Sequence, residues 1–146
     1  MKKGCIIAIV VVVALAVVGI ALFVIVGLPK LKNFGTAGFI VATETAVDMY
    51  VAEFGEAPKG NHEKVIEILR GNNPKEKNFL GSELDGAIVD GKVADVWRRP
   101  LKMNRAADGS LSFTSAGPNG EHGDEDDVTG AAVRDLVGKI QEKAAE

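Results

Sequence analysis

The feature that most constrains this chain is a run of 24 residues, from Cys5 to Leu28, that contains no charged side chain. At about 1.5 Å per residue, a helix of this length crosses the roughly 30 Å of a bilayer's hydrocarbon core. The run therefore predicts a transmembrane helix over residues 5–28. Residues 1–4, which include Lys2 and Lys3, are expected to form a short basic leader.

A cleaved secretory signal peptide is the competing interpretation of this run. Ala14-Leu15-Ala16 resembles a small-residue cleavage site behind a basic start. Cleavage there would leave 12 further apolar residues at the new terminus, so an uncleaved or N-terminally trimmed anchor is preferred. Lipid attachment at Cys5 is disfavoured because only four residues precede it. Two lysines lie on each side of the run, so charge does not set its orientation.

Helical patterning resumes directly after the apolar run and predicts a helical stem over residues 29–56. One side carries the larger apolar residues Ile40, Val47, Val51 and Phe54, with Tyr50 at its edge. The other side carries Gly38, Ala42, Thr45, Met49 and Ala52. A helix that packs its own domain on one flank and small-residue partners on the other has this composition, as does a buried helix of a larger monomer. Because Pro29 lacks a backbone N–H, we expect a bend or a local opening there.

The length of the chain, 146 residues, leaves room for one modest domain after the stem. The formal net charge is -3 and no basic patch with interleaved aromatic residues is present, so no nucleic acid is predicted as a partner. The single cysteine lies in the apolar run, so no disulfide is available to the domain.

Residues 57–146 are expected to form this domain, with an α+β fold. Asn61 is suited to cap a short helix over residues 62–70. Asp90-Gly91, between residues 87–89 and 92–94, predicts a hairpin. A second hairpin is predicted from residues 101–105 and 111–115, and the strands are expected to pack against the stem. Trp97 and the turn after it separate the hairpins, and Trp97 is interpreted as a core anchor.

The loop over residues 114–128 is the most informative local segment. Four successive acidic residues, Asp124 to Asp127, repel one another unless water solvates them or a cation bridges them. Calcium accepts carboxylate, amide and backbone oxygens, so a glycine-rich loop closing on Asn119, Asp126 and Asp127 suits it. A solvated acidic turn is the alternative, and the spacing is not that of an EF-hand.

A C-terminal helix is expected over residues 130–144, with Thr129 as its cap. Its apolar face consists of Val133, Leu136, Val137 and Ile140. This face is suited to dock on the sheet or on a neighbouring molecule.

Three segments resemble the major pseudopilin of type II secretion systems and the wider type IV pilin-like group. The stem segment from Ile40 to Tyr50 is similar to the family's helix, which ends in Asp-Met-Tyr. Asp95 to Leu101 is similar to its Asp-Pro-Trp-Gly-x-Pro-Tyr. Ser115 to Val128 is similar to its calcium loop, Ser-x-Gly-Pro-Asp-Gly followed by Asp-Asp-Ile. Together these segments lie within residues 36–128.

The resemblance implies a type IV pilin-like fold and a structural role in an envelope filament that acts in protein export. It implies calcium ligands at the side chains of Asn119, Asp126 and Asp127 and at backbone oxygens near Ala116 and Asp124. Asn119 replaces the family's usual Asp and contributes a neutral oxygen. The partners implied are the lipid bilayer, other pilin-like subunits packed through the N-terminal helix, and proteins of the secretion machinery. The implied location is the inner (cytoplasmic) membrane, which the chain crosses once, with the C-terminal domain on the periplasmic or extracytoplasmic side.

The N-terminus departs from the family's pattern. The family carries Phe-Thr-Leu after its cleavage site and a Glu inside the apolar run, whereas Cys5-Ile6-Ile7-Ala8-Ile9 has neither the Phe nor the Glu. A membrane-tethered calcium-binding scaffold or sensor that forms no filament is therefore the alternative function. An enzyme is not predicted, because Ser115, His62 and His122 are accompanied by no nucleophile elbow, zinc-protease or phosphate-loop pattern.

Overall fold

The computed structural model describes residues 16–144. The predicted leader and the first part of the predicted membrane helix, residues 5–15, lie outside the described residues. Two compact units make up the chain, Met1–Lys32 and Asn33–Glu146.

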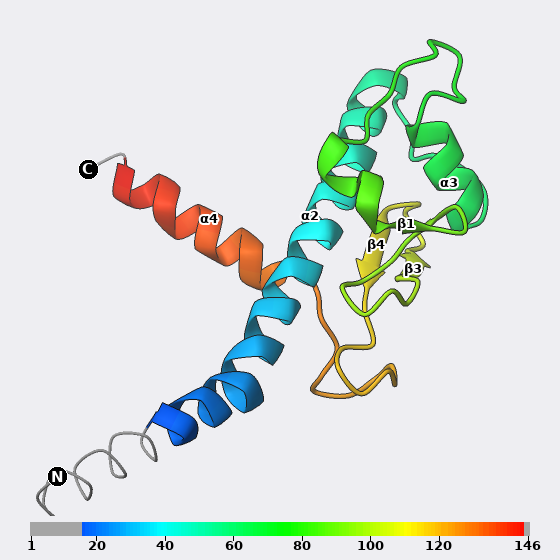
Figure 1. The fold of residues 1–146 in the computed structure, drawn as a ribbon. Helices are drawn as coiled ribbons and strands as arrows, with labels where there is room; N and C mark the ends of the chain where they lie inside the picture. Colours follow the sequence, from blue (N-terminus) through cyan, green and yellow to red (C-terminus); the bar gives the residue numbers. More distant parts are fainter. Residues whose placement is uncertain (1–15, 145–146) are drawn as a thin grey trace, which may run out of the picture. The chain divides into compact units, whose positions relative to one another are not determined.

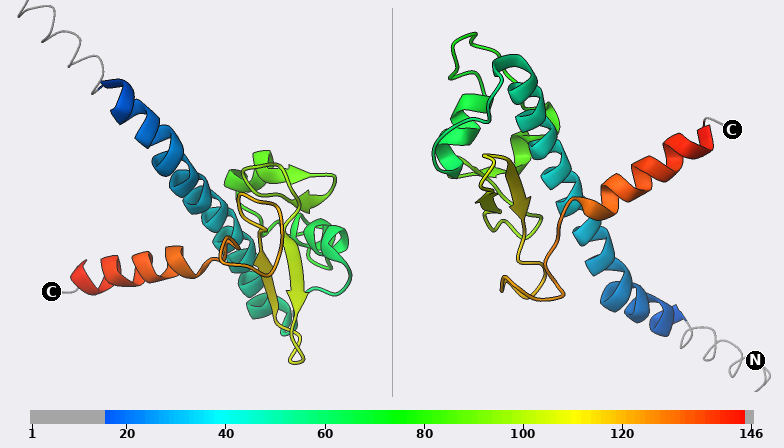
Figure 2. Two further views of the ribbon diagram at one scale, coloured as in Figure 1. Left: turned by 90° about the horizontal axis from the view of Figure 1, so that it is seen from below. Right: turned by 180° about the vertical axis from the view of Figure 1, so that it is seen from behind.

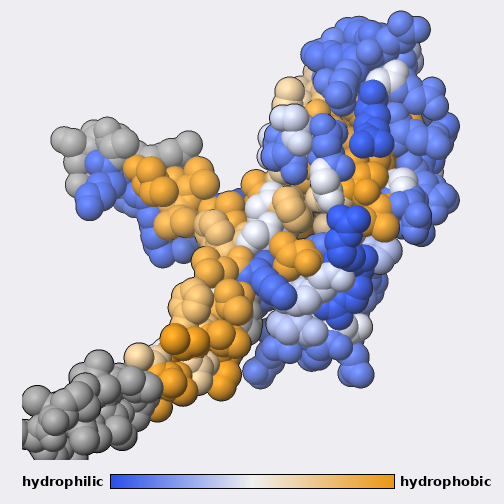
Figure 3. Space-filling model, viewed as in Figure 1, coloured by the Kyte–Doolittle hydropathy of each residue, from blue (hydrophilic) through white to orange (hydrophobic). Residues whose placement is uncertain are grey.

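The described part of the first unit is helical. A five-residue π-helix, η1 (Phe23–Gly27), is followed by α2 (Leu28–Phe54), and the N–H of Leu28 donates to the carbonyl oxygen of Phe23. This wider turn lies directly before Pro29 and matches the local opening expected there. The helical segment Ala16–Phe54 is long and apolar enough to span a membrane, and none of its most apolar window is buried inside the protein. Figure 3 shows the apolar surface of its first described turns.

In the second unit, α2 buries one flank against its own domain. Ile40 and Val47 are buried, and Val51, Phe54 and Tyr50 pack against the same core, as the apolar pattern predicts. Two threonines and two alanines extend the buried flank: Thr36, Ala37, Thr43 and Ala46. The hydroxyl of Thr43 donates to the carbonyl oxygen of Phe39 four residues back, which allows it to be buried in the helix.

Helix α3 (His62–Leu69) begins where its cap predicts. Asn61 has an extended backbone, and its side-chain oxygen accepts a hydrogen bond from the N–H of Lys64 at 3.0 Å. Val65, Ile66 and Leu69 are buried on its inner face. The prediction of a short capped helix is confirmed.

The strands form two hairpins, each a two-stranded antiparallel sheet. A 3-10 helix, η2 (Ser82–Ala87), leads into β1 (Ile88–Val89), which pairs with β2 (Lys92–Val93). Asp90 and Gly91 both have positive φ, at 49° and 77°, as a tight hairpin turn requires. The second hairpin pairs β3 (Lys102–Arg105) with β4 (Leu111–Thr114). Both predicted hairpins are confirmed.

The two hairpins and α3 lie along one flank of α2 (Figures 1 and 2). Phe113 on β4 is 1% exposed and contacts the ring of His62 on α3 at a centroid distance of 5.3 Å. Tyr50, Phe54 and Phe79 form an aromatic cluster at the C-terminal end of α2. The α+β fold, with small antiparallel strand pairs on a long helix, therefore agrees with the expectation, and the strands form two sheets rather than one.

The last helix, α4 (Ala131–Ala144), buries little of its apolar face. Val133 packs against the core, and Arg134 forms an ion pair with Glu44 on α2. Leu136, Val137 and Ile140 are all exposed. This face therefore does not dock on the sheet, and the helix is attached through its first turn.

Candidate metal site in the acidic loop

The loop after β4 is closed at its base by backbone hydrogen bonds. Ser115 and Val128 exchange two N–H to carbonyl bonds of 3.0 and 2.9 Å. The loop has two limbs, one that leaves β4 and one that carries the acidic residues. They touch at Gly117, which has a φ of +61°. A Cβ there would lie 1.9 Å from the carbonyl oxygen of Asp126, so only glycine allows this approach.

The first limb, residues 116–121, folds on itself. The carbonyl oxygen of Ala116 accepts from the N–H of Gly120 at 3.2 Å. The side-chain oxygen of Asn119 accepts from the N–H of Glu121 at 2.8 Å. Two of the oxygens that the resemblance implies as calcium ligands therefore already accept hydrogen bonds within the loop.

The acidic limb, residues 123–127, is organised around Asp124. Its carboxylate accepts from the amide of Asn119 at 2.6 Å and from the N–H of Asp126 at 3.0 Å, and its carbonyl oxygen accepts from the N–H of Asp127. One oxygen of Asp127 accepts from the N–H of Gly123 at 2.8 Å. The structure thus brings Asn119 and Asp124 together, and these two residues and Asp126 are all exposed.

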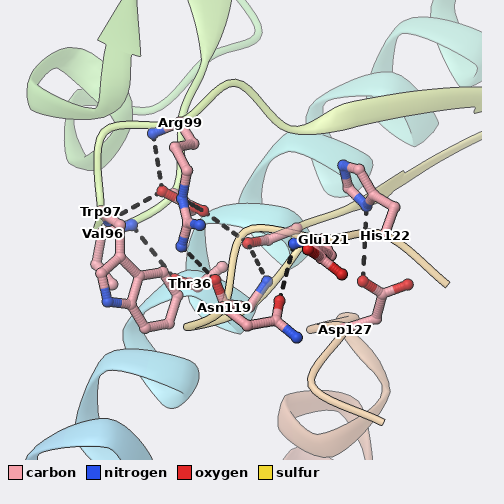
Figure 4. A network of polar contacts seen from close by, with 11 residues as sticks. Thr36, Val96, Trp97, Arg99, Asn119, Glu121, His122 and Asp127 are labelled. Atoms are coloured by element: carbon pink, nitrogen blue, oxygen red, sulfur yellow. Dashed lines mark hydrogen bonds and ion pairs between the residues drawn. The ribbon is translucent and has the colours of Figure 1, made fainter. Parts of the chain in front are cut away.

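The other carboxylate oxygen of Asp127 is the feature most suggestive of a cation. This Oδ1 atom is buried and accepts no hydrogen bond, and its neighbour at 3.6 Å is the Nδ1 atom of His122 (Figure 4). A buried carboxylate oxygen that accepts no hydrogen bond is costly, and either the neighbouring imidazole of His122 or a bound cation can offset that cost. Asp127 is therefore the predicted ligand whose surroundings fit a metal best.

The five predicted ligand residues are distributed along both limbs of the loop. Across residues 16–144, no three His, Cys, Asp or Glu side chains form a group able to hold a metal ion. The donors within the loop are carboxylate, amide and carbonyl oxygens, the set that calcium accepts in flexible geometry. Donor chemistry and the buried Asp127 oxygen fit calcium. The oxygens of Ala116 and Asn119 each accept one hydrogen bond and keep a second lone pair, so the hydrogen bonds that would rearrange on binding are those of the acidic limb.

A buried carboxylate, Asp95, links this loop to the turn between the hairpins. One oxygen accepts from the backbone N–H groups of Trp97 and Arg99, both at 2.9 Å. The other accepts from the hydroxyl of Ser115 at 2.7 Å. The N–H of Val96 donates to the hydroxyl of Thr36, which attaches the turn to α2. One side chain thus joins the turn to the base of the loop.

The sequence predicts a turn after Trp97 but not the contacts that Asp95 and Arg99 make with the loop. The hydrogen bonds from the backbone N–H groups of Trp97 and Arg99 to Asp95 could have been predicted, because an Asp side chain commonly accepts from backbone N–H groups a few residues ahead in a turn. The contact with Ser115, 20 residues away, carries no local signal. The interpretation of Trp97 as a core anchor is wrong, because its indole is only half-buried and lies beside the guanidinium of Arg99.

Ser115 and the two histidines have separate partners. The Ser115 hydroxyl donates to Asp95 and accepts from the N–H of Gly117. The Nε2 atom of His62 accepts from the N–H of Val93 at 3.2 Å, and burial lowers the pKa of this imidazole below its ordinary value of 6.5. Among the hydrogen bonds of the described residues, none joins Ser115 to either histidine.

Comparison with known protein families, with curated proteins and with solved structures finds no match for this chain.

Proposed function

We propose that this protein is a pseudopilin-like structural subunit of a type II secretion or related envelope filament and acts in protein export. The observation that carries the proposal is the division of α2 into two faces. One face is buried in the domain, while the exposed stem face, which consists of Phe34, Gly38, Thr45, Met49 and Ala52, is covered little or not at all. At 3.6 residues per turn these five residues share one side of the helix.

The exposed stem face supports packing against other stems. Phe34 and Met49 are each about half exposed, at 51% and 49%, and a Cβ on Gly38 would meet no atom within 4 Å. Small residues between larger apolar ones allow helices to approach closely, particularly near a membrane. Residues 16–54 are helical throughout, so the apolar segment leads directly into the stem. The proposed partners are the lipid bilayer, other pilin-like subunits and secretion-machinery proteins.

The proposal includes a calcium-stabilised loop. The side chains of Asn119, Asp126 and Asp127 and the backbone oxygens of Ala116 and Asp124 would hold the ion. Calcium would supply the positive charge that offsets the adjacent carboxylates and the unpartnered oxygen of Asp127. The chain's role is structural, so no catalytic residue is proposed.

The second candidate is a membrane-tethered calcium-binding scaffold or sensor that remains a monomer. It is favoured by the absence of an acidic residue between Cys5 and Leu28, where the resembling family carries a Glu associated with subunit registry.

Extraction from the native membrane in mild detergent separates the two candidates. The filament subunit should co-purify with other pilin-like chains, and its intact mass should lack Met1 to Gly4 if a prepilin-type peptidase processes it. Recovery of an isolated monomer of full-length mass would instead support the tethered scaffold.

A further inference from the structure

The guanidinium of Arg99 reaches from the turn between the hairpins to the first limb of the acidic loop (Figure 4). Its Nη2 atom donates to the carbonyl oxygen of Gly117, and its Nε atom lies 3.6 Å from the buried carboxylate of Asp95. The ring of Trp97 lies 5.3 Å from the guanidinium carbon. The hydrogen bond to Gly117, the nearby carboxylate and the indole together restrain the position of the group, although its Nε atom itself makes no hydrogen bond within the described residues.

The loop backbone fits closely around this side chain. A Cβ on Gly120 would lie 2.2 Å from the Nη1 atom of Arg99, so a larger residue there would displace the guanidinium. Gly117, which accepts the hydrogen bond from Arg99, touches the carbonyl of Asp126 on its other side. Arg99 therefore contacts the first limb at Gly117, and Gly117 in turn contacts the acidic limb at Asp126.

We propose that Arg99 is a positioning residue for cation binding, because its guanidinium holds the first limb in the shape that a divalent cation requires. The inference rests on the calcium loop of the proposed function. With the limb that carries Ala116 and Asn119 already fixed, the cation has only the acidic limb to order. Less conformational entropy is then lost on binding, which strengthens it.

Electrostatics alone makes the opposite prediction. A positive charge beside a cation site repels the ion, so removing the charge of Arg99 would tighten calcium binding if proximity were its only effect. A positioning role predicts weaker binding after the same change. The sign of the effect therefore distinguishes the two accounts.

The test is a calorimetric titration of calcium into the full-length chain in detergent micelles, for wild type, Arg99→Gln and Arg98→Gln. Arg99→Gln should weaken calcium binding by about tenfold or more, the usual effect of losing a group that orients metal ligands. Arg98 is the matched control, since its guanidinium donates to the carbonyl of Gly86 outside the loop. Arg98→Gln removes the same charge one residue away and should leave the affinity unchanged or slightly higher.

Amide hydrogen exchange without metal gives a second readout. Arg99→Gln should speed exchange over residues 116–121, because the first limb loses its anchor. Gly120→Ala keeps the charge of Arg99 but displaces its guanidinium, and should weaken calcium binding more than Gly123→Ala does. Both glycines have positive φ, so Gly123→Ala, whose Cβ would meet no atom within 4 Å, is the control for backbone strain. Gly120→Ala tests the same contact if Arg99→Gln folds poorly.

Two results would overturn the inference, and they differ in what else they remove. Equal or tighter calcium binding by Arg99→Gln, with unchanged exchange over residues 116–121, would refute the positioning role and leave the calcium loop standing. No binding of calcium by wild type would refute both the calcium loop and the role of Arg99. Filament assembly would remain to be judged by cross-linking of the stem.

Discussion

The carboxylate of Glu44 on α2 accepts a hydrogen bond from the backbone N–H of Phe113 on β4 at 3.0 Å. A side chain of the long helix thereby takes part in the hydrogen bonding of the second hairpin. The other oxygen of Glu44 faces Arg134 at the start of α4, so one carboxylate joins three elements of the domain. Its side chain is only 11% exposed.

Glu44→Ala should destabilise the domain by about 1–3 kcal/mol, because the N–H of Phe113 loses its acceptor in a place that water reaches poorly. Glu44→Gln keeps an acceptor and should cost less. Arg134→Ala is the control for the ion pair, and it should cost less than about 1 kcal/mol because Arg134 is 57% exposed. Urea unfolding of the full-length chain in detergent, followed by circular dichroism, measures the three free energies. A larger loss for Arg134→Ala than for Glu44→Ala would contradict this assignment.

Gly117→Ala should disturb the acidic loop more than Gly123→Ala does. Both residues have positive φ, which strains alanine by about 1–2 kcal/mol. Only at position 117 would the added Cβ also overlap the carbonyl oxygen of Asp126, since a Cβ on Gly123 meets nothing within 4 Å. Thermal unfolding and hydrogen exchange over residues 115–128 measure the difference. Equal effects would show that the close approach of the two limbs is not required.

His62 should make the domain sensitive to mild acid. Burial lowers the pKa of its imidazole in the folded protein below the ordinary 6.5, so the unfolded chain takes up the proton first as pH falls. The free energy of unfolding should therefore decrease as pH falls below about 6.5. His62→Gln retains an acceptor for the N–H of Val93 without titrating, and should remove this slope. His122→Gln should retain it, and a slope that survives in His62→Gln would rule out His62 as its source.

Calcium should raise the unfolding temperature of the full-length chain if the acidic loop binds it, because a ligand that binds only the folded state stabilises that state. Asp127→Asn should remove most of the increase. The carboxylate that this change removes is the one whose buried Oδ1 atom accepts no hydrogen bond from the described residues. Asp126→Ala should do the same as a predicted ligand. Glu125→Gln, which changes an acidic residue outside the ligand set, should retain it. The absence of any shift at millimolar calcium would remove the metal from this account.

The local parts of the fold were predictable because their signals lie within a few residues. Asn61 caps α3 through the N–H three residues ahead, and Asp90-Gly91 supplies the two positive φ values of the first hairpin turn. The stem's inner face followed from a period of 3.6 residues. Thr36 and Thr43 were missed because their burial depends on hydrogen bonds rather than on apolar character.

The candidate site was only partly predictable. The sequence pointed to the acidic loop and to Asp127, but it gave no account of Asp95 and Arg99. Their contacts with Ser115 and Gly117 join segments 18 to 20 residues apart, and such contacts depend on how the hairpins pack. The interpretation of Trp97 failed for a related reason, since a guanidinium covers its ring where an apolar core was expected.

The most direct test of the central claim, assembly through the exposed stem face, is photo-cross-linking in the native membrane. A benzoyl-phenylalanine in place of Phe34, which is 51% exposed, should yield a ladder of cross-linked species containing this chain and other pilin-like subunits. The same group in place of Asp108, in the turn between β3 and β4, is the control and should yield no such ladder. A ladder specific to position 34 is the predicted result. If protein that is folded and membrane-bound runs only as monomer after irradiation at position 34, the account is contradicted.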